Sequence, residues 1–227
     1  MNLLIERKAK GEAMKTYYLF DLDGTLLDPG IGITEGVRHA LRHFGIEVAE
    51  RSQLYPFIGP PLLDSFQEFM GLSPSEAKQA IRFYRDYYQD QGMYENTVYP
   101  AIPRVLASLK AQGKTLALAT SKPEYFAQKI LDHYDLAQYF DFVGGATLDE
   151  TRSKKSDVIQ YSLQHLDNPD VNQAVMIGDR KFDILAGKEI GLTTIGVLYG
   201  YGSKQELQAA GADYLVSQPE GLLDWKG

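Results

Sequence analysis

The sequence contains no cysteine, and it has no long run of apolar residues. The absence of cysteine excludes disulfides, thiolate nucleophiles and zinc–thiolate sites, so any metal site must use oxygen or imidazole ligands. No stretch approaches the roughly 18 consecutive apolar residues that a membrane-spanning helix requires. Lys and Arg number 23 against 30 Asp and Glu. This acidic balance argues against a general binder of nucleic acid or of anionic membranes, because both are held mainly by an excess of positive charge.

The beginning of the chain does not have the charge order of a secretory signal. The apolar residues 3–5 precede Arg7, Lys8 and Lys10, whereas a signal peptide places its basic residues first. We therefore expect a cytoplasmic protein. We interpret residues 1–14 as an N-terminal tail that carries no chemistry.

Short apolar stretches alternate with helical periods over most of the 227 residues. This alternation is typical of a parallel sheet with helices packed on it. The predicted strands are 17–20, 115–119, 142–144, 175–177, 193–198 and 214–216. The predicted helices between them are 103–111, 123–133, 157–166, 183–189 and 204–210. Ser121 and Glu124 have the spacing of a capping box at one helix start. The predicted fold class is α/β, a doubly wound parallel sheet.

A long helical segment interrupts this alternation after the first strand. It contains only predicted helices, which are 34–44, 60–70 and 74–90. A connection of about 70 residues is far longer than the usual crossover of a parallel sheet, so it must be a domain of its own. We therefore expect an inserted helical cap over 31–97 and a Rossmann-like core made of 15–30 and 98–227.

Three glycines, Gly30, Gly32 and Gly36, follow the first strand at nearly the spacing of a dinucleotide-binding loop. The spacing has one residue too many, and a polar loop separates the glycines from the strand. We predict instead that they form a flexible hinge leading to the cap.

Acidic and hydroxyl side chains follow several of the predicted strands. They are Asp21 and Asp23 after the first strand, Thr120 and Ser121 after the second, and Asp179 and Asp183 after the fourth. In a parallel sheet, ligands collect outside the carboxyl ends of the strands, so these side chains should converge in one crevice.

Such a group of carboxylates suits metal-dependent chemistry. Several carboxylates cannot share a small cleft in ionised form unless a cation offsets their repulsion, and Mg²⁺ prefers hard oxygen ligands. A carboxylate can also act as a nucleophile toward a phosphate ester. A second carboxylate two residues further on could protonate the leaving oxygen and then accept a proton from water.

These residues resemble the motifs of the haloacid dehalogenase superfamily, in the order that the family has them. Asp21 to Asp28 resembles the first motif, and Thr120-Ser121 resembles the second. Lys154-Lys155 resembles the third motif, and Gly178-Asp179 with Asp183 resembles the fourth. The resemblance extends from about Thr16 to the end of the sequence and includes the position of the inserted cap. Segments 57–61 and 195–202 are similar to the phosphoglycolate-phosphatase-like branch, which includes bacterial members described as 5′-nucleotidases.

The resemblance implies a role for each motif residue. Asp21 would be the nucleophile and Asp23 the general acid and base. Thr120, with the backbone N–H of Ser121, would hold phosphoryl oxygens. A lysine would offset the charge of the phosphoenzyme; we favour Lys155, just before a predicted helix, and keep Lys154 as the alternative because the usual Lys-Pro is missing.

The resemblance also implies the ligands of a Mg²⁺ ion. They would be Asp21, the backbone carbonyl of Asp23, and Asp179, with Asp183 in or beside the metal shell. The alternative for Asp183 is a helix cap. In the cap, the turn at Gly59 and the side chain of Arg85 are our candidates for substrate contact.

We therefore predict a Mg²⁺-dependent phosphomonoester hydrolase that acts through an aspartyl phosphate, with phosphoglycolate as the first substrate candidate. The alternatives are a 5′-nucleotidase, a sugar phosphomutase and a non-catalytic phosphate-responsive module. The expected partner is a small phosphorylated metabolite rather than nucleic acid or membrane. The sequence leaves the oligomeric state open.

Overall fold

The computed structural model describes residues 16–225, so the tail interpreted from residues 1–14 lies outside the described residues. The chain divides into two compact units. Unit 1 takes the chain up to Leu27 and from Val98 onward, and unit 2 is Asp28–Thr97. In the part described, no helix has the length and apolar character needed to cross a membrane.

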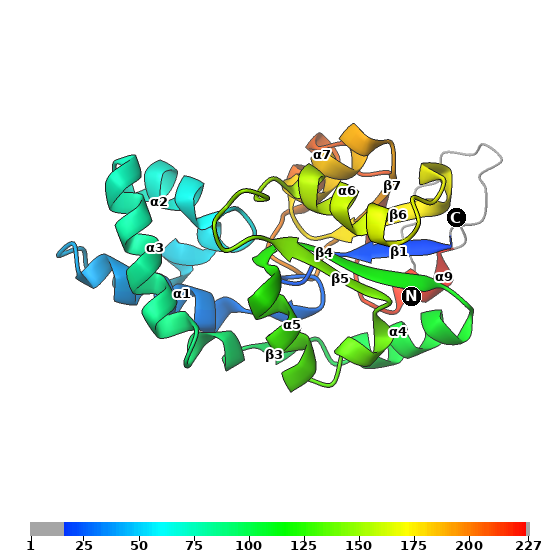
Figure 1. Ribbon diagram of the computed structural model, residues 1–227, viewed down its shortest axis with the longest axis horizontal. Helices are drawn as coiled ribbons and strands as arrows, with labels where there is room; N and C mark the ends of the chain where they lie inside the picture. Colours follow the sequence, from blue (N-terminus) through cyan, green and yellow to red (C-terminus); the bar gives the residue numbers. More distant parts are fainter. Residues whose placement is uncertain (1–15, 226–227) are drawn as a thin grey trace. The chain divides into compact units, whose positions relative to one another are not determined.

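Unit 1 is built on a six-stranded parallel sheet with the order β5-β4-β1-β6-β7-β8 (Figure 1). The strands are β1 (Tyr17–Phe20), β4 (Thr115–Pro123), β5 (Phe142–Ala146), β6 (Ala174–Gly178), β7 (Thr193–Val197) and β8 (Tyr214–Val216). The chain starts in the middle of the sheet, moves outward to β5, and returns to continue on the other side of β1. The predicted doubly wound α/β fold is confirmed.

Helices cover both faces of this sheet (Figure 1). They are α4 (Ile102–Ala111), α5 (Glu124–His133), α6 (Lys155–His165), α7 (Lys181–Ile190), α8 (Lys204–Ala209) and α9 (Gly221–Asp224), with short 3₁₀ turns η3 (Ala137–Tyr139) and η4 (Val171–Gln173). In Figure 1, α6 and α7 lie on one side of the sheet and α4, α5 and α9 on the other. All five helices predicted between the strands are present, with ends shifted by a few residues.

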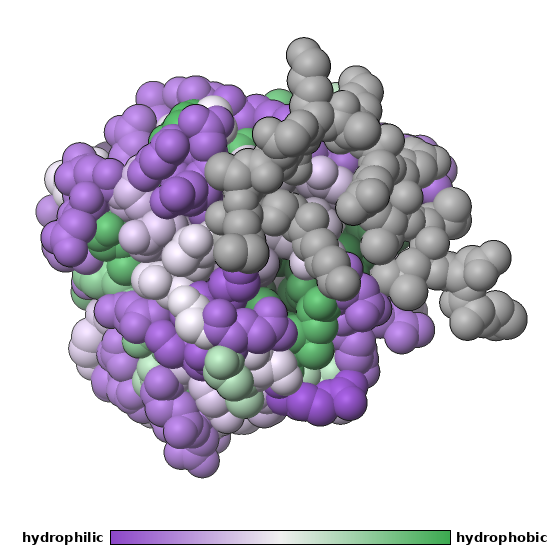
Figure 2. Space-filling view, turned by 90° about the vertical axis from the view of Figure 1, so that its right-hand side faces the viewer, coloured by the Kyte–Doolittle hydropathy of each residue, from purple (hydrophilic) through white to green (hydrophobic). Residues whose placement is uncertain are grey.

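Alternation along β1 fills the two layers of the core, because successive side chains of a strand point to opposite faces. Leu19 belongs to a buried cluster with Val158 and Ile159 of α6. Tyr18 instead packs edge-on against Trp225, with ring centroids 5.9 Å apart. Figure 2 shows the face at the right of Figure 1; where described residues are visible on it, hydrophilic residues predominate and hydrophobic residues form small groups.

The strand order changes direction beside β1. In a doubly wound sheet, the connections from the two central strands run to opposite sides, which leaves an opening at their carboxyl ends. Here those strands are β1 and β6, and their pairing continues to the hydrogen bond from Asp21 N to Ile177 O, at 2.9 Å. The ligand position expected for this fold is therefore next to Asp21.

Unit 2 is mainly helical. It contains α1 (Gly30–Arg42), η1 (Arg51–Phe57), α2 (Leu62–Met70), α3 (Pro74–Tyr88) and η2 (Gly92–Tyr94). The short strands β2 (Leu27–Asp28) and β3 (Thr97–Val98) pair where the chain passes between the units.

The prediction of a flexible glycine hinge is wrong, because Gly30 and Gly32 lie in the first turn of α1. The Asp28 carboxylate accepts a hydrogen bond from Gly30 N, at 2.8 Å, at the start of this helix. The backbone of Gly32 packs so closely on Gly92 that a Cβ would overlap with the Gly92 carbonyl. Glycine is therefore needed at position 32 for close packing rather than for flexibility.

Candidate active site

Three aspartates of unit 1 lie together at the carboxyl ends of β1 and β6. Asp21 follows β1, Asp179 follows β6, and Asp183 lies in the first turn of α7. One carboxylate oxygen from each lies within 4.8 Å of the others, and all three side chains are buried. The fold thus brings together acidic residues that are far apart in the sequence, and we call them the aspartate cluster.

Lys155, the first residue of α6, is the cation of the aspartate cluster. Its Nζ lies 2.8 Å from Asp21 Oδ1 and 2.8 Å from Asp183 Oδ1, and it donates to Ala119 O at 3.0 Å. Burial lowers the pKa of Lys155, but the Asp183 and Asp21 carboxylates outweigh it and hold this pKa above its ordinary value. Lys154, the alternative lysine of the third motif, is exposed and precedes the helix.

The aspartate cluster has more negative charge than Lys155 can balance. Three ionised carboxylates against one ammonium leave two negative charges in a buried space. Burial and the neighbouring Asp183 and Asp21 raise the pKa of Asp179 well above 3.8, and burial raises the pKa of Asp183 to about 6. A divalent cation would restore the balance, so the donor set fits Mg²⁺.

Asp179 is held with one oxygen ready for a ligand. Its Oδ2 accepts a hydrogen bond from Tyr201 N at 2.7 Å, while its Oδ1 has no hydrogen-bond partner among the described residues. Gly24, in a turn with φ +79°, and Gly200 both lie so close to Asp179 that a Cβ on either would overlap with its side chain. The two turns therefore fix the direction of the Asp179 carboxylate.

Asp183 combines the two roles that the sequence left open. Its Oδ2 accepts a hydrogen bond from Arg180 N at 3.1 Å, which caps the start of α7. Its Oδ1 faces Lys155. The cap aims the second oxygen into the aspartate cluster, so the structural and the functional interpretation are compatible.

The Asp23 carboxylate points to a different lysine. Its Oδ2 lies 2.8 Å from Lys122 Nζ, and both side chains are buried. Burial raises the pKa of Asp23, and the charge of Lys122 only partly opposes this rise. Its Oδ1 has no hydrogen-bond partner in the described part of the chain. A buried carboxyl group with a raised pKa is suited to donate a proton.

Sequence reasoning missed Lys122, although it directly follows Thr120 and Ser121. Its side chain reaches Asp23 because of a bulge in β4. Thr120 pairs with Gly145 and Pro123 with the next residue, Ala146, so Ser121 and Lys122 are extra residues in the ladder. Bulges commonly redirect side chains near active sites. One signal could have indicated Lys122: a second buried carboxylate, Asp23, needs a cation of its own.

Thr120 and Ser121 lie at the same edge of the sheet as the aspartate cluster. Thr120 is buried and follows Ala119, whose carbonyl accepts from Lys155. Its Oγ1 accepts a hydrogen bond from Lys122 N at 3.2 Å. Ser121 is partly exposed. The predicted Ser121–Glu124 capping box is wrong, because the bulge extends β4 to Pro123 and α5 begins without a side-chain cap.

Two predicted substrate contacts, Gly59 and Arg85, belong to unit 2. Gly59 lies between η1 and α2 with φ +108°, and Arg85 lies in the last turn of α3. The structure describes them within that unit, so their contact with substrate stays a prediction.

Comparisons with known proteins agree with the motifs. The family described as haloacid dehalogenase-like hydrolase matches residues 18–197. A 5′-nucleotidase from Pseudomonas aeruginosa is 42% identical over 191 residues, which cover 84% of this chain and 86% of the relative. A phosphoglycolate phosphatase from Vibrio vulnificus is 31% identical over 214 residues, which cover 90% and 93% of the two chains.

A solved structure is also similar to this chain in fold and in sequence. The crystal structure of a predicted phosphatase from Clostridium acetobutylicum has a TM-score of 0.91 and 44% identity. The match covers 94% of this chain and all of that one.

The charge imbalance predicts a pH-dependent stabilisation by Mg²⁺. In the metal-free protein, Asp179 and Asp183 bind protons that the unfolded chain has already released, so their contribution to stability is lost as pH rises from the ordinary Asp value through the raised values. Bound Mg²⁺ would replace these protons. The increase in melting temperature caused by Mg²⁺ should therefore be larger at about pH 8 than at about pH 5, measured by thermal unfolding.

Asp179→Asn is the matched test of this explanation. It removes one of the repelling charges, so the metal-free protein should melt no lower than the original, and Mg²⁺ should no longer raise the melting temperature. Asp90→Asn, at an exposed carboxylate of unit 2, is the control and should leave the Mg²⁺ effect intact. An undiminished Mg²⁺ effect in Asp179→Asn would contradict the assignment.

Proposed function

The chain belongs to the haloacid dehalogenase-like hydrolases and is a phosphatase of this family, and on that basis we propose Mg²⁺-dependent hydrolysis of small phosphate monoesters through an aspartyl phosphate on Asp21. The observation that carries the proposal is the contrast between two neighbouring aspartates. Asp21 lies against Lys155 in the aspartate cluster, whereas Asp23 pairs with Lys122 and has a raised pKa.

The first step forms a covalent intermediate. An Asp21 carboxylate oxygen attacks phosphorus, and the bond between phosphorus and the ester oxygen breaks. Asp23 donates its proton to the departing oxygen, which leaves as an alcohol. Lys155 offsets the negative charge near Asp21, and Thr120 with the N–H of Ser121 would hold phosphoryl oxygens.

The second step restores the enzyme. Asp23, now a carboxylate, accepts a proton from a water molecule that attacks phosphorus, and the bond to Asp21 breaks to release inorganic phosphate. Asp21, Asp179, Asp183 and the backbone carbonyl of Asp23 would hold Mg²⁺, which supplies positive charge for the phosphoryl oxygens. Phosphoryl transfer depends mainly on such positioning and charge compensation.

Two substrate classes have specific support. Phosphoglycolate is favoured by the likeness of segments 57–61 and 195–202 to its phosphatases and by the Vibrio vulnificus relative of that name. Nucleoside 5′-monophosphates are favoured by the Pseudomonas aeruginosa relative named a 5′-nucleotidase.

A phosphate-release screen tests the proposal directly. We expect release from phosphoglycolate or from a nucleoside 5′-monophosphate at a higher kcat/KM than from sugar phosphates, because relatives of this chain are named for activity on the first two classes. Excess chelator should stop release, and added Mg²⁺ should restore it. Conversion of a sugar phosphate to its isomer without phosphate release would favour the mutase, and no turnover on any substrate would favour the non-catalytic module.

Asp21→Asn should remove the covalent step. The amide is a poor nucleophile, so we expect kcat to fall by roughly 10⁴-fold or more and the acid-stable labelling of the protein by substrate phosphate to disappear. Circular dichroism should show an unchanged fold. A phosphoenzyme that still forms in this variant would place the nucleophile elsewhere.

Asp23→Asn should reveal a general acid through the leaving group. Alkyl phosphates need protonation of the leaving oxygen, so their hydrolysis should fall by about 10²–10⁴-fold. Phosphoenzyme formation from p-nitrophenyl phosphate should fall much less, because p-nitrophenolate leaves without a proton. Equal losses for both substrates in a pre-steady-state burst assay would argue against this role for Asp23.

A further inference from the structure

Arg152, in the loop between β5 and α6, makes three kinds of contact. Its Nε donates to Gly145 O at 2.9 Å, and its Nη2 lies 3.0 Å from Glu124 Oε2. Its guanidinium carbon lies 3.5 Å from the ring centroid of Tyr161 on α6. The side chain is 21% exposed. A planar guanidinium can satisfy a carbonyl, a carboxylate and an aromatic face at once, which an ammonium cannot.

The partners of Arg152 adjoin the bulge that carries Lys122. Glu124 is the first residue of α5, directly after the end of β4. Its Oε2 also accepts from Gly145 N at 3.3 Å, so Arg152, Glu124 and Gly145 form a closed ring of polar contacts. A Cβ at Gly145 would lie 2.7 Å from Glu124 N and 2.7 Å from Lys122 O. The carboxyl ends of β4 and β5 are thus packed tightly at this point.

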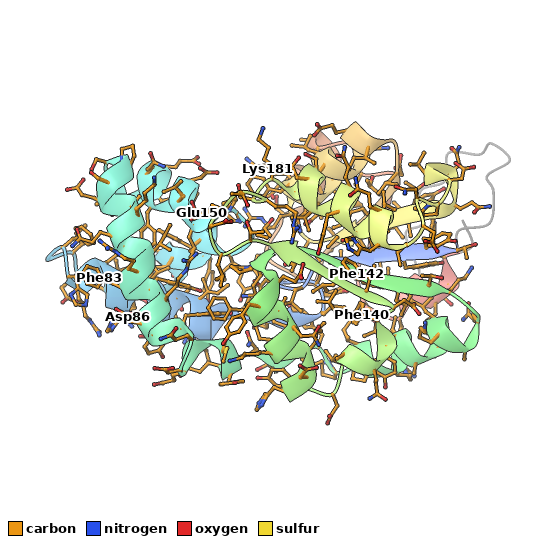
Figure 3. All side chains as sticks on the ribbon, viewed as in Figure 1. Phe83, Asp86, Phe140, Phe142, Glu150 and Lys181 are labelled. Carbon is orange, nitrogen blue, oxygen red and sulfur yellow. The ribbon has the colours of Figure 1, made fainter. Side chains whose placement is uncertain are left out.

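Arg152 also closes the loop that leads to Lys155. Thr147 N donates to Arg152 O, and Arg152 N donates to Thr147 Oγ1, both at 3.0 Å. Figure 3 labels Glu150 in this loop and Phe142 at the start of β5, the strand that precedes the loop. The chain passes from Arg152 into α6, where Lys155 begins the helix.

We propose that Arg152 is a positioning residue for phosphoryl transfer, which holds the Lys122 bulge and the Lys155 loop in register with each other. Arg152 acts through these lysines and touches neither the aspartate cluster nor Asp23. Lysine side chains are long and flexible, so the position of their charges depends on how firmly their backbone is held. Misplacement of a catalytic group by about 1 Å can cost about 10²-fold in rate. This inference rests on the proposed phosphatase activity.

The kinetic test compares Arg152→Gln with Arg152→Lys and Arg104→Gln. Arg104 forms an exposed ion pair with Glu220 and is the control for loss of a surface pair. We expect Arg152→Gln to lower kcat by about 10- to 100-fold with little change in KM, because the substrate contacts are intact. Arg152→Lys should recover part of the loss by restoring the pair with Glu124. Arg104→Gln should retain full kcat.

Glu124→Gln provides a second variant in case Arg152→Gln does not fold. It removes the charge of the partner, and it should lower kcat without raising KM, though less than Arg152→Gln. Wild-type kcat in both Arg152→Gln and Glu124→Gln would overturn the inference, as would a loss of kcat matched by an equal loss of folded protein.

Hydrogen exchange measured by mass spectrometry tests the same inference without turnover. In Arg152→Gln, exchange should accelerate in segments 119–125 and 145–155 and stay unchanged in β7. Unchanged exchange in the first two segments would overturn the inference even if the wild-type protein hydrolysed no phosphate ester. Absence of wild-type turnover with accelerated exchange would instead contradict only the proposed function.

Discussion

The arrangement of the candidate site follows from one constraint, a concentration of negative charge where water is largely excluded. Asp21, Asp179 and Asp183 offer oxygens within 4.8 Å of one another, and all three are buried. Such an arrangement costs stability unless cations or protons neutralise it. The parallel sheet supplies the convergence, the start of α7 aims Asp183, and the first residue of α6 supplies Lys155. These three features hold or balance the charge of the aspartate cluster.

Two buried lysines divide the site into two parts with different chemistry. Lys155 lies against Asp21 and the aspartate cluster, whereas Lys122 lies against Asp23. Aspartates two residues apart in one turn would otherwise share an environment. Because their cations come from separate segments, one carboxylate can face the phosphoryl group while the other carries a proton. The bulge of β4 is the backbone feature that permits this separation, since it turns Lys122 toward Asp23.

The sequence was sufficient for features that local patterns encode. Apolar runs predicted all six strands of the main sheet, and the polar residues at their ends predicted the meeting of Asp21, Asp179 and Asp183. The sequence was insufficient for features that arise from a tertiary contact. The bulge at Lys122 is a matter of register between strands, and Gly32 is required by packing on a glycine 60 positions away. The partners of Arg152 likewise meet only after β4 and β5 have paired.

The members of the aspartate cluster differ in how much they depend on a bound cation. Asp183 already has Lys155 and the start of α7 as partners, and Asp21 has Lys155. The side chain of Asp179 accepts one backbone hydrogen bond, and its other oxygen is unpaired within the described residues. Burial, together with the neighbouring Asp183 and Asp21 carboxylates, raises the pKa of Asp179 well above the ordinary value. A divalent cation would therefore change the surroundings of Asp179 most, whereas Asp183 already has Lys155 as a partner.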